Sequence, residues 1–100
     1  MFAKSFISNF LKRKLQPKNR CMYACLHGQY IGKMFVFIKH ENNLFHFLML
    51  PDMKNISMNF EIFKNGIENY ILDKVKILDK KYWKVCEEKF NKNFIDNFKK

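Results

Sequence analysis

Threonine is absent from this 100-residue sequence, and alanine (two), proline (two) and glycine (three) are rare. The sequence contains no internal repeat and no low-complexity tract. Hydrophobic residues make up 48% of the chain and aromatic residues 17%, which is more than disordered proteins carry. One hundred residues have no room for a second core, so we expect residues 1–100 to form a single small basic domain.

Acidic residues are missing from the first forty positions. Residues 1–40 carry eight basic residues and no Asp or Glu, whereas residues 41–100 carry eleven basic and nine acidic residues. The two parts therefore contribute +8 and +2 to the net charge of +10. This asymmetry favours an anionic partner near the N-terminal part of the chain.

Codon composition offers a different explanation for the lysines. Lys, Asn, Phe, Ile and Tyr all have AT-rich codons and together supply 53 residues, and Lys outnumbers Arg by 17 to 2. A low-GC genome, such as that of a bacterium, its phage or an AT-rich eukaryotic parasite, produces this bias. The number of lysines is therefore weak evidence for nucleic-acid binding, and their uneven distribution is better evidence.

Two further absences bear on location. The N-terminus lacks the basic segment followed by a continuous apolar run that marks a signal peptide, and no apolar stretch approaches the ~20 residues of a membrane span. The cysteines, Cys21, Cys25 and Cys86, are odd in number, so free thiols in a reducing compartment are expected. We predict a cytoplasmic protein (in the host cytoplasm if phage-encoded). A transit peptide is the alternative, because the first residues are basic and contain serine.

The segment Met34–Leu50 predicts a β-hairpin that is apolar on both faces. Its turn is expected at Glu41–Leu44, because asparagine tolerates positive φ. A strand at Cys21–His27 would precede the hairpin and join it through a tight turn at Gly28. The predicted sheet is thus a three-stranded antiparallel meander over residues 21–50.

These turns imply a register for the sheet. We expect the pairs Tyr23 with Met34, Ile38 with Phe47, and Val36 with Met49. A slip of one residue would exchange the two faces, but both would stay apolar. Each face of the sheet therefore needs a cover.

Apolar residues at helical spacing predict three helices. The first is an amphipathic helix at residues 1–15, followed by a basic connector at 16–20. The second spans 60–78, with a possible break at 65–66, and the third spans 79–98 with Asp79 as its N-cap. Residues 53–59 are expected to be a loop, with Ser57 as a possible helix cap. The predicted fold is α+β, a three-stranded antiparallel meander packed with three helices in the order αβββαα.

The spacing of the residues supports neither a metal site nor a catalytic site. A zinc site of the Cys₃His type would need Cys21, Cys25, His27 and Cys86. Residues four apart on a strand lie ~13 Å apart, which is too far for one ion, so we expect buried cysteines and no metal or cofactor. No nucleophile, base and orienting group are suggested by spacing, and His46 is expected on a semi-buried sheet face, so we predict no enzyme.

A basic cluster follows the first predicted helix, with five cations in nine residues. It could bind phosphates, bind an anionic membrane, or be a solvated helix end whose cations suit the helix dipole. We extend it along the second predicted strand to give a candidate nucleic-acid-binding set. Its members are Lys12, Arg13, Lys14, Lys18, Arg20, Lys33 and Lys39.

Four apolar residues form a candidate interaction surface, namely Phe35, Phe37, Leu48 and Leu50. If exposed, the two phenylalanines would be a stacking platform for single-stranded RNA; burial under a helix or in a dimer interface is favoured. The preferred function is a small non-enzymatic binding or regulatory protein that acts through a protein partner or as a homodimer, such as a phage or mobile-element accessory protein. The alternative is a nucleic-acid-binding protein that uses the basic N-terminal part. Peripheral membrane contact is less favoured, and no small-molecule substrate is evident.

Overall fold

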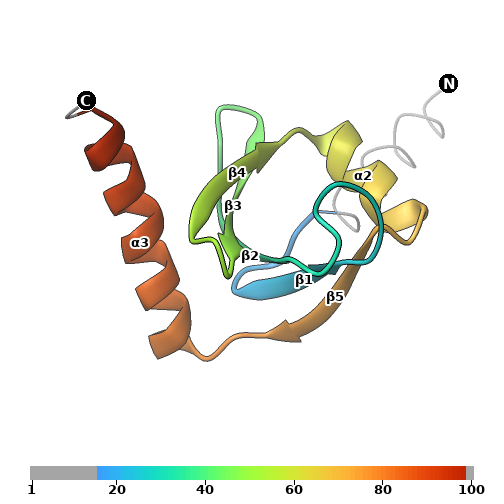
Figure 1. Ribbon diagram of the computed structural model, residues 1–100, viewed down its shortest axis with the longest axis horizontal. Helices are drawn as coiled ribbons and strands as arrows, with labels where there is room; N and C mark the ends of the chain where they lie inside the picture. Colours follow the sequence, from blue (N-terminus) through green and yellow to red (C-terminus); the bar gives the residue numbers. More distant parts are fainter. Residues whose placement is uncertain (1–15, 99–100) are drawn as a thin grey trace, which may run out of the picture.

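The computed structural model describes residues 16–98, with side chains to residue 95 (Figure 1). The fold is α+β, with one five-stranded antiparallel sheet in the order β4-β3-β2-β1-β5 and two helices. Along the chain the elements are β1 (Cys21–Cys25), β2 (Met34–Glu41), β3 (Leu44–Leu50), β4 (Lys54–Met58), α2 (Phe60–Glu68), β5 (Leu72–Ile77) and α3 (Lys80–Phe98).

The α+β class is confirmed, but the three-stranded meander with three helices in the order αβββαα was wrong. Residues 54–58 form the edge strand β4 and not a loop. Residues 72–77, predicted as helix, form the opposite edge strand β5. The predicted helix at 1–15 lies outside the described residues, and the predicted last helix at 79–98 is α3.

The predicted helix at 60–78 ends early because the backbone turns sharply after α2. Tyr70 has a φ of 56°, a left-handed conformation that no helix interior adopts. The chain then pairs with β1, and Leu72 becomes buried opposite Cys25. Gly66 does not break α2; it allows Leu72 to approach, because a Cβ at Gly66 would lie 2.7 Å from Leu72 Cδ1.

The cap of α2 is Asn59 and not Ser57. The Asn59 side chain accepts a hydrogen bond of 2.8 Å from the Ile62 amide, as an N-cap residue should. Ser57 lies within β4, where its side chain contacts His46.

The predicted turn at Glu41–Leu44 is confirmed, but the register of β2 was wrong by one residue. Asn42 and Asn43 have positive φ, and Glu41 pairs with Leu44. A bulge at Ile38 then shifts the pairing, so that Phe37 faces Phe47. On the other side, the connection from β1 is longer than a tight turn.

The shift makes Tyr23 face Phe35 where Met34 had been expected, and Met49 likewise faces Phe35 where Val36 had been expected. As a result, the β2 residues exchange faces relative to the prediction.

Both faces of the sheet are apolar, as predicted, and both are covered. The strands curve around the inner face (Figure 1). On this face, aromatic residues pack against Phe63 of α2. On the outer face, Val36, Ile38 and Leu48 pack against Cys86 and Phe90 of α3. Ten of the eleven buried residues of the inner face lie in strands, namely Cys21, Tyr23, Cys25, Phe35, Phe37, Phe45, Phe47, Met49, Met58 and Leu72.

Hydrogen bonds also attach α3 to the outer face. The Trp83 indole donates a hydrogen bond to the Phe37 carbonyl over 2.8 Å. The side-chain amide of Asn55 donates one to the Phe90 carbonyl over 3.0 Å. Farther along α3 the helix packs less closely on the sheet, since Phe94 is 41% exposed. Among the described residues, no helix is long and apolar enough to span a membrane.

Candidate binding groove at the open edge of β4

A groove of about 630 Å³ lies beside the inner face of the sheet. Its apolar wall includes Phe35 and Ile56 from the sheet, Ile62 from α2, and Tyr30 from the loop between β1 and β2. None of the described residues that line it is an Asp, Glu, Lys or Arg. In a protein with a net charge of +10, this groove is an uncharged site.

The main chain of β4 forms one side of this groove, and the hairpin determines which of its groups face it. Because the turn has two residues with positive φ, Glu41 and Leu44 form a hydrogen-bonded pair. The main-chain groups of Leu44 therefore point toward β2. Successive residues of a strand alternate in direction, so those of Phe45 and Phe47 point toward β4.

The register of β4 completes the assignment. Phe45 faces Met58 and Phe47 faces Ile56, so the main-chain groups of Met58 and Ile56 bond to β3. The N–H and C=O groups of Asn55 and Ser57 consequently point to the open edge, and both residues line the groove. The geometry thus combines an apolar wall with hydrogen-bonding groups at its border.

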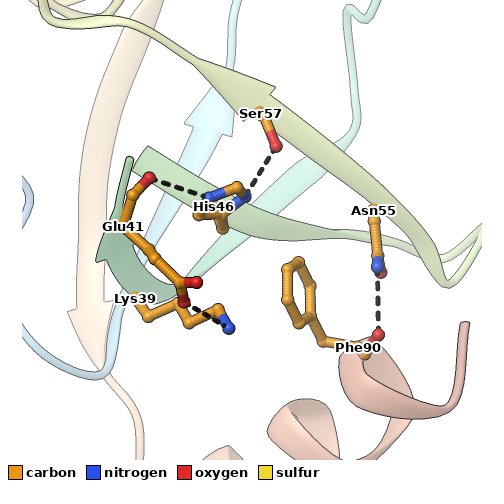
Figure 2. A network of polar contacts seen from close by, with 6 residues as sticks. All are labelled: Lys39, Glu41, His46, Asn55, Ser57 and Phe90. Carbon is orange, nitrogen blue, oxygen red and sulfur yellow. Dashed lines mark hydrogen bonds and ion pairs between the residues drawn. The ribbon is translucent and has the colours of Figure 1, made fainter. Parts of the chain in front are cut away.

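The side chains of these two edge residues are occupied elsewhere (Figure 2). The Ser57 hydroxyl lies 2.7 Å from His46 Nδ1, while His46 Nε2 lies 3.2 Å from the Glu41 carbonyl oxygen. A carbonyl only accepts, so in the neutral ring Nε2 carries the proton and Nδ1 accepts from Ser57. His46 is thus a buried histidine with both nitrogens satisfied, as expected of a structural residue.

The opposite edge of the sheet, β5, has a different character. A bulge between Met22 and Tyr23 interrupts its pairing with β1. Exposed Lys74 and Lys76 flank this bulge, and bulges and lysines both oppose the addition of another strand. The β4–β3 pairing contains no such shift, so β4 is the edge better suited to strand addition.

The predicted interaction surface does not form one surface. Phe35 and Phe37 are buried on the inner face, at 2% and 4% exposure. Leu48 is fully buried and Leu50 half-buried on the outer face beneath α3. The register shift at Ile38 is the reason that these four residues separate.

The predicted basic set is also divided. Lys12, Arg13 and Lys14 lie outside the described residues. Lys33 and Lys39 form 2.8 Å ion pairs with Asp52 and Glu41. The Glu41 pKa is lowered by the hydrogen bond and the charge of Lys39. Lys18 is exposed and Arg20 half-buried at the start of β1.

The cysteines lie apart and are all buried free thiols. Cys21 and Cys25 are on the inner face, whereas Cys86 is on α3 and packs against the outer face, so the sheet separates them. Burial raises the pKa of the Cys86 thiol. Within the part of the chain that the structure describes, no group of three His, Cys, Asp or Glu residues could hold a metal ion.

Comparison with known proteins supplies no relative. No family model matches the chain, and neither a curated protein nor a solved structure gives a significant match.

Sequence reasoning missed Asn55, Ile56 and Ser57 as site residues. The one available signal was the alternation in residues 54–58, where Ile56 and Met58 point inward between polar neighbours. Two apolar residues are too few to distinguish a strand from a loop.

Proposed function

We propose that this is a non-enzymatic binding protein that acts through a partner protein. The groove receives an extended, uncharged segment of that partner, which adds as a strand beside β4. One observation carries the proposal: the main-chain groups of Asn55 and Ser57 face a groove whose described lining contains no charge. The contact surface thus differs from the one expected from the sequence.

Strand addition suits this geometry for two reasons. The two outward-facing residues offer two N–H donors and two C=O acceptors, and main-chain hydrogen bonds provide affinity in this type of recognition. Alternate side chains of the added strand would lie on the apolar wall around Ile56 and Met58. A β4 of five residues corresponds to a segment of about 17 Å at ~3.4 Å per residue.

A cytoplasmic location is part of the proposal. It is supported by three buried cysteines that are all free, which is common in reducing compartments. The low-GC composition in turn supports an accessory protein of a phage or mobile element.

The test uses a displayed library of random peptides selected against the whole protein. We expect the selected peptides to be extended and without charged residues. Ser57→Pro removes one outward N–H, and an edge strand tolerates proline there because that N–H is outside the β3–β4 ladder. Affinity should fall by about tenfold in this variant, as expected for one lost hydrogen bond.

Ser57→Ala is the matched control. It removes the hydroxyl that contacts His46 but keeps the amide, so it should bind the peptides like the wild type. Peptides that bind Ser57→Pro as tightly as the wild type would contradict strand addition. A dimeric native mass that Ser57→Pro converts to a monomeric one would identify a second copy of the chain as the occupant instead.

A further inference from the structure

Basic residues from two distant parts of the sequence meet at the β1–β5 edge of the sheet. The Leu78 amide donates to the Arg20 carbonyl over 2.8 Å. The Lys18 amide donates to the Tyr23 hydroxyl over 3.4 Å, and Tyr23 lies directly opposite Lys74 in the β1–β5 pairing. The connector before β1 therefore runs beside the end of β5.

We call this region the basic edge. It consists of the cationic residues of the connector, of β5 and of the first turn of α3. They are Lys18, Arg20, Lys74, Lys76, Lys80 and Lys81. All of these except the half-buried Arg20 are exposed.

The described residues of this region carry an excess of positive charge. Residues 16–20 carry two cations and no acid, and residues 72–84 carry five lysines and two aspartates. These two stretches contribute +2 and +3 to the net charge. The ion pairs between described residues, Lys33 with Asp52 and Lys39 with Glu41, involve none of the basic edge.

The placement of these charges suits an extended polyanion. Lys74 lies opposite the inner-face residue Tyr23, whereas Lys76 lies opposite the outer-face residue Met22. Cations thus stand on both sides of one exposed edge, which favours a charged chain that follows the edge over a single compact anion. Exposed Ile77 (57%) and Tyr82 (49%) lie among them, where apolar and aromatic groups can contact sugars and bases.

We propose that the basic edge binds the phosphate backbone of a nucleic acid without sequence selectivity. This site is separate from the groove, because none of the basic-edge residues lines the groove. Each phosphate contact releases counterions, so the affinity must fall steeply with salt.

The experiment is fluorescence anisotropy of the full chain with a labelled duplex DNA and a labelled single-stranded RNA, each from ~50 to ~200 mM salt. Replacing Lys74 and Lys76 together with Gln should weaken binding to both probes. It should also reduce the slope of log K against log salt by about 2, roughly one per lost phosphate contact.

The matched control replaces Lys54 and Lys92 with Gln. This variant has the same net charge, but its changes lie in β4 and in α3, away from the basic edge, and both lysines are exposed. The slope should then stay at the wild-type value. Equal thermal midpoints for both variants would establish that each remains folded.

Several outcomes would overturn the proposal. Equal losses in the two double variants would mean that net charge alone attracts the probes. Negligible binding at ~50 mM salt would exclude phosphate contacts of this number. Binding to phosphatidylserine vesicles without binding to either oligonucleotide would identify a membrane surface as the partner. Ser57→Pro should leave the salt slope unchanged. The test of nucleic-acid binding is therefore independent of the test of the groove.

Discussion

At the scale of single residues, aromatic rings form the centre of the inner face. Phe47 is fully buried and stacks on Phe63 of α2, with ring centroids 6.0 Å apart and planes inclined by 20°. The same ring contacts Tyr23, Phe35 and Phe37 at 5.5–6.3 Å. These contacts connect α2 to β1, β2 and β3, and they position the wall of the groove.

Gly66→Ala should destabilise the protein, although alanine favours helices by about 1 kcal/mol. A Cβ would lie 2.7 Å from Leu72 Cδ1 and 3.0 Å from Leu72 Cγ, and overpacking of this kind costs about 1–3 kcal/mol. We expect a net loss of up to about 2 kcal/mol in urea unfolding. In a Leu72→Ala background the same change should be neutral or stabilising. A stabilised Gly66→Ala in the wild-type background would contradict the close contact between α2 and β5.

Tyr23 should make stability depend on alkaline pH. Burial raises its pKa to about 12 from an ordinary value of 10.0, while the hydrogen bond from the Lys18 amide acts in the opposite direction. The unfolded chain then loses this proton first as the pH rises. Stability from Tyr23 should be constant below about pH 10 and should fall between about pH 10 and pH 12. Urea unfolding of the wild type and Tyr23→Phe would measure this, and an identical alkaline decline in both would refute it.

At the scale of elements, α3 is the cover that the outer face requires. It contacts β2, β3 and β4, and Phe90 also has the Lys39 ammonium 5.8 Å from its ring centre. Because α3 occupies this face, the apolar residues of the sheet beneath it are unavailable to a partner. This is the reason that the proposed contact to another protein lies at the β4 edge.

Trp83→Phe tests the attachment of α3. The substitution removes the indole N–H and leaves the Phe37 carbonyl without this donor, which should cost about 1–2 kcal/mol. Circular dichroism during urea unfolding measures the change. Tyr82→Phe is the control, since Tyr82 is 49% exposed on the same helix and should unfold like the wild type. Equal midpoints for all three proteins would show that the indole bond contributes nothing.

The elements that could be predicted from sequence are those with strong local signals. The Asn42–Asn43 turn and the two apolar faces of β2 and β3 follow from residue types that are adjacent in the chain. β4 could not be recognised because only two of its five residues, Ile56 and Met58, are apolar. β5 could not be recognised because it is stabilised by pairing with β1, which lies far away in the sequence. In β5, Leu72 is the one buried residue, so the segment shows no alternation of burial.

The candidate site was harder to predict for a related reason. The groove depends on which main-chain groups of β4 face outward, and that depends on register across three strands. The bulge at Ile38 has no sequence marker, and it reversed the expected faces of β2. The lysines of β5 are visible in the sequence, but their position near Arg20 follows only from the pairing of β1 with β5.

For the whole molecule, two opposite edges of one sheet have different chemistry. The β5 edge carries lysines and a bulge, while the β4 edge borders an uncharged, apolar groove. The two proposals thus assign a protein segment to one edge and a nucleic acid to the other. Among the described residues, no strand pairs with the main-chain groups of Asn55 and Ser57 on the groove side of β4.

Amide hydrogen exchange, followed by NMR, tests that claim most directly. In the free protein the amides of Asn55 and Ser57 should exchange quickly, and the amide of Ile56 should be protected by its bond to β3. Adding a peptide selected from the displayed library should protect Ser57 and leave Ile56 unchanged. Strong protection of Asn55 and Ser57 in the free protein, or continued fast exchange with the peptide bound, would contradict the account.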